Sequence, residues 1–305
     1  MKILCLADLH LTEKKPQCRP DEEDWMLTLE RKFKWLEDVA LHQQVDTIVI
    51  AGDVFDSVNR CSHEFMSFCI TRLTALRDVI GAACIFALPG NHDLVNADHA
   101  RIVQSPYGVL KSCRLLRYPN IAPYSEIGVM WYGDTKYEGI SPVVIGHYGL
   151  WHKEKPFKDA PDEGNVEWFV KHCLPKTCKL FITGHYHLPF VAKVDGTTVV
   201  NCGCPFRMRA DLIDYKPTVT IADIDSDFNV TTETFEIPLE YEIRRDYIDD
   251  KKDRETALDE MVGNIEGDFE AGFNFRDNFF SMSKECENST EINKEFERCA
   301  NGYYN

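Results

Sequence analysis

Five short apolar segments of this chain each run directly into a turn that carries His, Asp or Asn. The clearest is residues 85–88, which are followed by Pro89 and then by Gly90-Asn91-His92-Asp93. Gly90 is expected to allow a backbone conformation that other residues resist. The other four turns are Asp8-Leu9-His10, Gly52-Asp53-Val54-Phe55-Asp56, Gly146-His147 and Gly184-His185-Tyr186-His187. One such turn alone is ordinary, because loops favour these residues, but their recurrence predicts a shared site.

The segments between these turns predict an α/β fold. Strands over 2–7, 46–51 and 84–88 alternate with amphipathic helices over 22–43 and 63–80, in which apolar residues recur every three or four positions. This alternation favours parallel strands joined by helical crossovers. Further strands are predicted at 128–132, 142–145, 179–183, 190–194, 197–201, 218–224 and 230–237. We therefore expect two mixed β-sheets packed as a sandwich and flanked by helices.

The composition changes near Pro238. Residues 241–305 contain 17 acidic and 9 basic side chains, so this segment carries half of the chain's net charge of −16. We predict a main domain over residues 1–237 and a small acidic cap or partner-docking tail over residues 238–305.

Charge and hydropathy exclude several classes of protein. The net charge of −16 argues against charge-driven wrapping of nucleic acid. No apolar run approaches the roughly 18–20 residues that a membrane span needs. The first expected strand is interrupted by Asp8, which leaves no room for a secretory leader, so we expect a cytoplasmic protein. The 12 cysteines include no CxxC pair, which makes a thiolate zinc site unfavourable and predicts reduced, mostly buried thiols.

The five polar turns are suited to metal binding. In sheets of this kind the carboxyl edge is where ligands bind, so the five turns can converge on one site. One intervening residue in Asp-x-His and His-x-His lets two side chains point the same way. The mixed oxygen and nitrogen donors are enough for two metal ions that share one carboxylate. They favour Mn²⁺, Fe or Zn²⁺ over Mg²⁺.

These five motifs, in this order, resemble the calcineurin-like metallophosphoesterase superfamily over roughly residues 1–223. The resemblance implies that Asp53 bridges two metal ions and that His92 protonates the leaving oxygen or steadies the phosphate, with Asp93 fixing its orientation and tautomer. For Asp56 two roles stay open: it either contacts the metal ligands or caps a helix, or it takes part in catalysis. The implied ligands are Asp8, His10, Asp53 and His187 for one ion, and Asp53, Asn91, His147 and His185 for the other.

Within that superfamily the chain is most similar to the nuclease subunit of the SbcCD repair complex. The similarity rests on the Asp53 and His92 motifs and on Gly203-Cys204-Pro205-Phe206-Arg207, where Cys204 replaces the usual serine. The region after the core is shorter than is usual in that family, as in a compact phage or viral version acting in the host cytoplasm. The resemblance implies a Mn²⁺-dependent DNA exonuclease and endonuclease that works with an SbcC-type ATPase and, in some relatives, as a homodimer.

Basic residues near the motifs are candidates for DNA contacts. The resemblance implies that Arg207, which follows the last metal motif, binds the substrate through its phosphate backbone. The additional candidates for contact with the DNA backbone are Lys14, Lys15, Arg19, Arg60 and Arg209.

Two other functions remain open from the sequence. A stand-alone nucleotide phosphodiesterase or phosphoprotein phosphatase fits the same ligands, and the negative net charge and shortened cap favour it. A non-catalytic scaffold that keeps the fold would be expected to lose ligands, and here every ligand position is filled.

Overall fold

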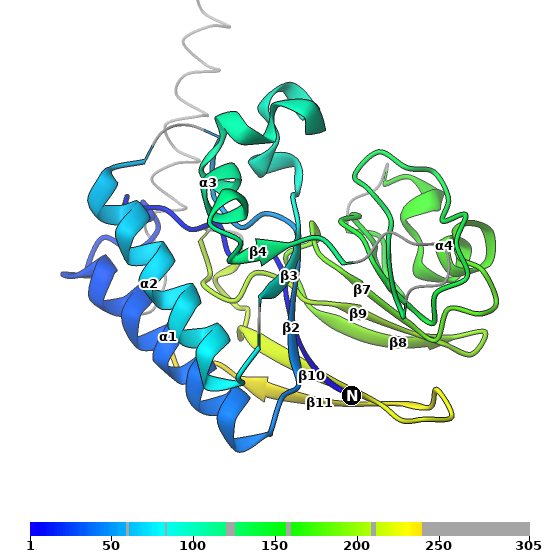
Figure 1. The fold of residues 1–305 in the computed structure, drawn as a ribbon. Coiled ribbons are helices and arrows are strands. Elements are labelled where there is room, and N and C mark those ends of the chain that lie inside the picture. Colours follow the sequence, from blue (N-terminus) through cyan, green and yellow to red (C-terminus); the bar gives the residue numbers. More distant parts are fainter. Residues whose placement is uncertain (59–60, 83, 120–125, 157–159, 209–211, 240–305) are drawn as a thin grey trace, which may run out of the picture. The chain divides into compact units, whose positions relative to one another are not determined.

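The computed structural model describes residues 1–58, 61–82, 84–119, 126–156, 160–208 and 212–239. They form two β-sheets that pack face to face, with helices on the outer faces (Figure 1). This confirms the predicted α/β sandwich of two mixed sheets. The predicted boundary at residues 237 and 238 stays a prediction, because nearly all of the acidic segment after it lies outside the described residues.

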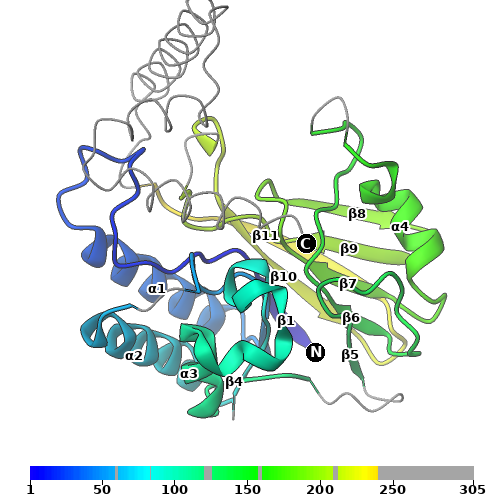
Figure 2. The same cartoon turned by 90° about the horizontal axis from the view of Figure 1, so that it is seen from above.

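The first sheet holds the strands that precede three of the five polar turns. Its order is β11-β10-β1-β2-β3-β4, in which β1 to β4 are parallel to one another and β10 and β11 are antiparallel additions. Its strands are β1 (Lys2–Leu6), β2 (Thr47–Ala51), β3 (Ile85–Leu88), β4 (Leu116–Arg117), β10 (Thr218–Ile224) and β11 (Val230–Glu236). The carboxyl ends of β1, β2 and β3 therefore lie at one edge (Figure 2).

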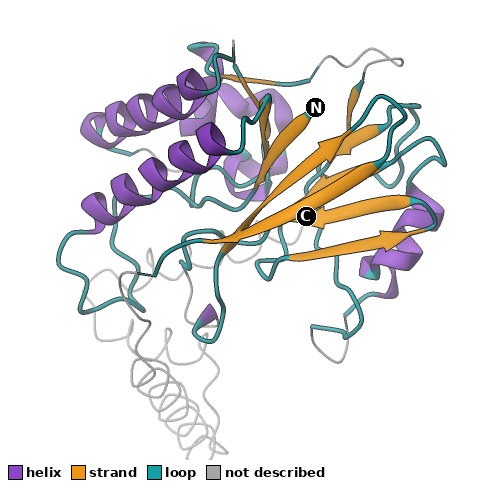
Figure 3. Ribbon diagram, turned by 90° about the horizontal axis from the view of Figure 1, so that it is seen from below, coloured by secondary structure: helices purple, strands orange, loops and turns teal. Residues whose placement is uncertain are grey.

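The second sheet holds the strands that precede the other two turns. Its order is β5-β6-β7-β9-β8, and all pairs are parallel except the β8–β9 hairpin. Its strands are β5 (Ile127–Val129), β6 (Val143–Ile145), β7 (Leu180–Thr183), β8 (Phe190–Val194) and β9 (Thr197–Asn201). Figure 3 shows the strands of both sheets with the helices outside them.

In the part of the chain that the structure describes, four α-helices cover the outer faces. They are α1 (Trp25–His42), α2 (His63–Val79), α3 (Pro106–Ser112) and α4 (Val166–Cys173), and short 3₁₀ helices occupy Asn91–Asp93, Val95–Ala97, His99–Gln104 and Asp162–Gly164. Asp24 caps α1 by accepting a bond from the Leu27 N–H at 2.9 Å, and Ser62 and Asn165 cap α2 and α4 in the same way. The sequence predicted α1 and α2 with ends shifted by up to three residues, but it predicted neither α3 nor α4.

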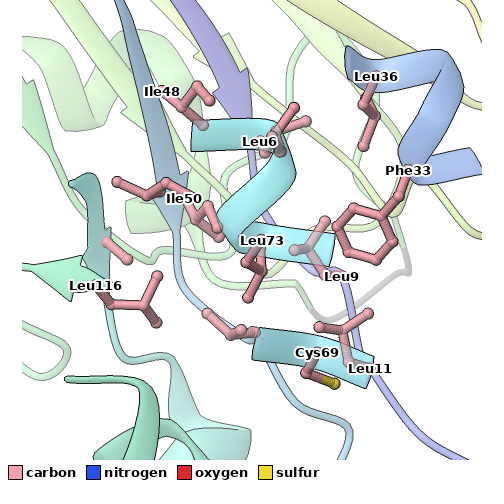
Figure 4. Packing of buried hydrophobic residues seen from close by; sticks show 14 of the residues in the cluster. Leu6, Leu9, Leu11, Phe33, Leu36, Ile48, Ile50, Cys69, Leu73 and Leu116 are labelled. Carbon is pink, nitrogen blue, oxygen red and sulfur yellow. The ribbon is translucent and has the colours of Figure 1, made fainter. Parts of the chain in front are cut away.

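The core has three layers that follow from this arrangement. One cluster joins α1, α2 and α3 to the first sheet, and Figure 4 shows the helix residues Phe33 and Leu73 and the strand residues Leu6 and Ile50 among its members. A second cluster fills the space between the sheets, and a third lies between α4 and the second sheet. Both sheets are therefore buried on both faces, which explains why their central strands read as continuous apolar runs.

The cysteines behave as the sequence predicted. Within the described ranges none forms a disulfide, and most are buried. Burial raises the pKa of the Cys5, Cys178 and Cys204 thiols to about 12. Among the described residues, no helix combines the length and apolar composition needed to cross a lipid bilayer.

Candidate metal centre

Backbone hydrogen bonds lock the first two polar turns together. Beyond the ends of β1 and β2, the Asp8 N–H donates to the Gly52 carbonyl at 3.0 Å and the His10 N–H donates to the Asp53 carbonyl at 3.1 Å. These bonds continue the parallel pairing of the two strands into the turns. As a result, the side chains of Asp8, His10 and Asp53 are delivered to one place at the edge of the sheet.

The five turns bring their side chains together in two groups. The donor atoms of Asp8, His10 and His187 lie within 4.8 Å of one another, and so do those of Asp53, His147 and His185. The groups touch, because His10 Nε2 lies 3.8 Å from Asp53 Oδ2 and also belongs to a third grouping with Asp53 and His92. Each group takes its members from both sheets, so the centre forms only when the sheets pack.

Asn91 joins the group around Asp53. Its Oδ1 lies 2.9 Å from His185 Nδ1 and 3.2 Å from His147 Nε2. The seven predicted ligands therefore lie together at one site. Their role as metal ligands stays a prediction.

Contacts behind the site orient the most deeply buried histidine. His147 is 1% exposed, and its Nδ1 lies 2.7 Å from the carbonyl oxygen of Ala51. Because a carbonyl only accepts, the proton is on Nδ1, and Nε2 faces Asp53 Oδ2 at 3.3 Å. This is how a buried partner commonly fixes the tautomer of a metal-binding histidine.

The orientation of His92 differs from the prediction. Its Nδ1 donates to the backbone carbonyl of Asp56 at 2.7 Å, and its backbone N–H donates to Asp53 Oδ1 at 2.9 Å. The Asp93 carboxylate instead accepts bonds from the backbone N–H groups of Val54, Phe55 and Gly90, each at 3.0 Å. Asp93 was expected to orient His92, but it braces the two turns, since its side chain points back toward β2.

Glycine at position 90 is required for a different reason than the sequence suggested. Gly90 has φ −92° and ψ −171°, which is ordinary extended backbone. A Cβ at this position would overlap the Asp53 carboxylate and lie 2.5 Å from the Asp53 backbone nitrogen. The position therefore needs glycine for close approach to Asp53, and not for its freedom of rotation.

Several residues of the centre have a positive φ angle, which residues other than glycine rarely adopt. The φ angles are +49° for Asp8, +45° for His10, +49° for Asp53 and +79° for His185. Such residues cost on the order of 1–3 kcal/mol each and persist where the surrounding structure imposes them, commonly at functional sites. Of the twelve non-glycine residues with positive φ in the described part of the chain, four belong to this one cluster.

Burial and neighbouring charges shift the pKa values of the side chains at the centre. Burial lowers the pKa of His10 to about 3 and that of His185 to about 4, so both imidazoles are neutral at pH 7. Burial also raises the pKa of Asp8 to about 7. Burial opposes the charged form of His147 too, but its hydrogen bond to Asp53 and the charge of Asp53 raise its pKa to about 9.

This donor set fits divalent metal ions. His10 and His185 are already in the neutral form that binds metal, whereas His147 would release a proton when metal binds. Mixed nitrogen and oxygen donors suit Mn²⁺, Fe and Zn²⁺. His10 Nε2 and His187 Nε2 face each other at 3.1 Å, with Asp8 Oδ1 4.0 Å from each of them. A cation among these three atoms would offset the cost of burying Asp8.

Two of the predicted DNA-contacting arginines are buried. Arg207 is 2% exposed, and its guanidinium donates to the carbonyl oxygens of Leu212 and Ile213 at 3.2 and 2.6 Å. This contradicts its predicted role in substrate binding, because its hydrogen-bonding groups serve a loop of the same chain. Arg19 is also 2% exposed and pairs with Glu22.

The other basic candidates differ in position. Lys14 is exposed and lines a groove of about 250 Å³ beside Asp56, whose carbonyl holds His92. Lys15 is exposed and donates to the carbonyls of Pro20 and Glu22 at 2.9 Å. Arg60 and Arg209 lie outside the described residues.

Replacing Arg19 by alanine is expected to lower the free energy of unfolding by about 3 kcal/mol. Arg19 Nη1 lies 2.9 Å from Glu22 Oε2, and Nη2 donates to the Phe206 carbonyl at 2.9 Å, so the change leaves a buried carboxylate without its cation. Urea denaturation measures the effect. The control is Lys34→Ala, which removes an exposed pair with Glu30 and should change little. Equal effects of the two substitutions would contradict a structural role for Arg19.

Sequence reasoning missed one side chain at the site. Tyr132 follows β5, and its ring centroid lies 6.1 Å from that of His147 and 6.3 Å from that of His185. The predicted strand over 128–132 included this residue, whereas β5 ends at Val129 and Tyr132 belongs to the turn after it. Gly133-Asp134, directly after Tyr132, is the turn signal that would have moved the end of that strand.

Comparisons with known proteins agree with this geometry. The DNA double-strand break repair protein Mre11 of Saccharolobus solfataricus is 25% identical over 227 residues, covering 70% of this chain and 57% of that protein. Mre11 of Sulfurisphaera tokodaii is 24% identical over 232 residues, covering 70% and 56%. The chain therefore spans less than two thirds of the length of these curated relatives.

Solved structures with a similar chain course include a dimetal phosphatase from Danio rerio and Vps29 from Entamoeba histolytica in complex with zinc. The first has a TM-score of 0.47 and 11% identity, and covers 78% of this chain and 98% of that one. The second has a TM-score of 0.36 and 17% identity, and covers 78% and 100%.

The family comparison covers most of the chain. The calcineurin-like phosphoesterase model matches residues 1–218, which contain all five polar turns and all strands of both sheets except β11 and β10, of which only the first residue is matched. Proteins of this type hydrolyse phosphoesters at a dinuclear metal centre, in agreement with the two groups of donor atoms found here. The chain belongs to the calcineurin-like phosphoesterase family.

Proposed function

We propose that this chain is a Mn²⁺-dependent DNA nuclease that cleaves phosphodiester bonds as both an exonuclease and an endonuclease. The observation that carries the proposal is the pair of donor groups that meet at Asp53, with His92 beside them. The similarity to two proteins named for DNA double-strand break repair supports DNA as the substrate.

Each group is proposed to hold one metal ion, and Asp53 to belong to both. Asp8, His10 and His187 complete one set, and Asn91, His147 and His185 complete the other. When bound, two divalent ions would supply an activated water and would offset the charge that develops on the phosphoryl oxygens.

The residues around the centre are proposed to position and protonate the substrate. The Asp56 carbonyl accepts a hydrogen bond from the Nδ1–H of His92, so the imidazolium form of His92 would deliver its Nε2 proton to the leaving oxygen and keep the Nδ1 proton. Asp93 supports this indirectly, because its carboxylate ties the turn that carries His92 to the turn that carries Asp53. Among the described basic residues, we propose that Lys14, which lies in the groove beside Asp56, contacts the DNA backbone.

The proposed partners follow from the resemblance to the nuclease subunit of the SbcCD complex. We assign residues 1–237 to the nuclease domain and propose that the acidic segment 238–305 docks on a basic surface of an SbcC-type ATPase. Pairing of two nuclease domains through the core is part of the same proposal. A cytoplasmic location, in a host cell for a viral version, agrees with such a partner.

A stand-alone nucleotide phosphodiesterase or phosphoprotein phosphatase is the second candidate. The burial of Arg19 and Arg207 favours it, because it removes two cations from the surface that a DNA backbone would meet. The net charge of −16 acts in the same direction. A small substrate needs far fewer phosphate contacts than duplex DNA.

The deciding experiment is degradation of end-labelled linear duplex and single-stranded DNA in the presence of Mn²⁺, Mg²⁺ or EDTA. The wild-type protein is compared with the His92→Ala and Asp53→Ala variants. Mn²⁺-dependent cleavage that both substitutions abolish supports the nuclease. Intact DNA, together with hydrolysis of a mononucleotide or a chromogenic phosphodiester, would transfer the assignment to the second candidate.

A further inference from the structure

A buried asparagine outside the five motifs holds the turn that carries His187. Asn201 is the last residue of β9, pairs with Thr183 of β7 and is 0% exposed. Its Nδ2 donates to the carbonyl oxygens of Tyr186 at 2.6 Å and Leu188 at 2.7 Å. Both hydrogens of the amide are thus used on the two residues that flank His187.

The residues after Asn201 complete this contact. The Cys204 N–H donates to the His187 carbonyl at 3.0 Å, so the segment 201–204 binds the carbonyls of residues 186, 187 and 188 in turn. Gly203 has φ +67°, and a Cβ there would lie 2.8 Å from the His187 carbonyl oxygen. Hydrogen bonds from one neighbouring segment therefore fix the backbone on both sides of His187 and at His187 itself.

His185, two residues earlier, has anchors of its own. Its backbone N–H lies 3.0 and 2.9 Å from the two carboxylate oxygens of Asp8, and its Nδ1 lies 2.9 Å from Asn91 Oδ1. These contacts do not involve Asn201. The two histidines of one motif are therefore positioned by different parts of the chain.

We propose that Asn201 is a positioning residue that sets His187 for the ion held by Asp8, His10 and His187. The inference rests on the proposed two-metal site and adds to it a residue from outside the ligand motifs. The chemistry requires an amide, because both contacts need a donor. An aspartate of the same shape would set carboxylate oxygens against two carbonyl oxygens, and these like partial charges repel.

The test compares Asn201→Asp and Asn201→Ser with the wild-type protein by calorimetric titration of the metal-free chain with Mn²⁺. Loss of a residue that orients a metal ligand typically costs 10–100-fold in metal affinity. We expect one of the two Mn²⁺ sites to weaken by about that factor while the other keeps its affinity. Circular dichroism melts of the metal-free proteins identify a temperature at which every variant is folded, and the titrations are run there.

Asn165→Asp is the matched control. Asn165 caps α4 through Oδ1, which accepts from the N–H groups of Glu167 and Trp168 at 3.0 and 3.1 Å. An aspartate keeps these acceptors, so Mn²⁺ binding should not change. The same asparagine-to-aspartate change should thus be tolerated at position 165, where the side chain accepts hydrogen bonds, and harmful at position 201, where it donates them.

The outcomes separate this inference from the proposed nuclease activity. Folded Asn201→Ser protein that binds two Mn²⁺ with wild-type affinities would overturn the positioning role, and so would equal weakening of both sites. Wild-type protein that binds fewer than two Mn²⁺ would remove the premise and the inference with it. Selective loss of one site in a protein that leaves DNA intact would support the role of Asn201 and count against the nuclease alone.

Discussion

Replacing Asp53 by asparagine is expected to lower the kcat for phosphodiester hydrolysis by more than the roughly 10–100-fold that loss of an outer partner of a metal ligand costs. Asp53 Oδ2 lies 3.3 Å from His147 Nε2 and 3.8 Å from His10 Nε2, so its carboxylate faces both donor groups at once. Asparagine keeps the size of the side chain beside Gly90 but removes the charge and one of the two oxygens. Both proposed ions should be lost or weakened together.

Calorimetric titration with Mn²⁺, alongside steady-state kinetics, measures this effect. Asp195→Asn is the control, since Asp195 is an exposed turn residue with φ +47°, a conformation that asparagine tolerates well. The control should keep both sites and full activity. An Asp53→Asn protein that still binds two Mn²⁺ with wild-type affinity would refute the bridging role of Asp53.

The grouping of the candidate ligands could be predicted from sequence for a simple physical reason. Each of the five turns follows a strand, the strands are parallel, and parallel strands present their carboxyl ends at a common edge. The apolar runs fix the strands, and the first polar residues after them fix the donors. Asp8 and His185 come from opposite sheets and yet share two hydrogen bonds, as the convergence of the turns requires.

The sequence did not predict what holds those donors in place. The family resemblance assigned Asp93 to His92, but the side chains of these adjacent residues point in different directions. The partner of His92 is the Asp56 carbonyl, 36 positions away, and a backbone atom leaves no signature in the sequence. The role of Asn201 toward His187 was missed for the same reason.

The buried arginines illustrate a second limit. Arg19 and Arg207 follow metal motifs in the chain, which made them candidates for phosphate contacts. Their guanidinium groups instead reach loop carbonyls, including that of Phe206, which lies 187 positions from Arg19. Charge and position along the chain cannot distinguish an arginine that binds phosphate from one that supports a loop, because both use the same donors.

Replacing His92 by alanine is expected to lower kcat on DNA by about 10²–10⁴-fold while leaving Mn²⁺ binding intact. The Nδ1 of His92 is committed to the Asp56 carbonyl, so we assign Nε2 to proton delivery and not to metal binding. Titration with Mn²⁺ tests this division directly, because His92 also lies within reach of His10 and Asp53. His42→Ala is the control, since His42 makes the same kind of bond, from Nδ1 to the Asp38 carbonyl at 2.7 Å, in the last turn of α1.

The leaving group provides the sharper measurement. Cleavage of DNA expels an alkoxide-like oxygen that needs a proton, whereas an aryl phosphodiester expels a phenolate that is stable without one. Loss of His92 should therefore reduce hydrolysis of the aryl ester far less than cleavage of DNA. Equal losses on both substrates, with two Mn²⁺ still bound, would assign His92 to holding the phosphate, because that contact serves either leaving group alike. A loss of bound Mn²⁺ would make it a ligand, and the proton would then have to come from another residue at the edge of the two sheets.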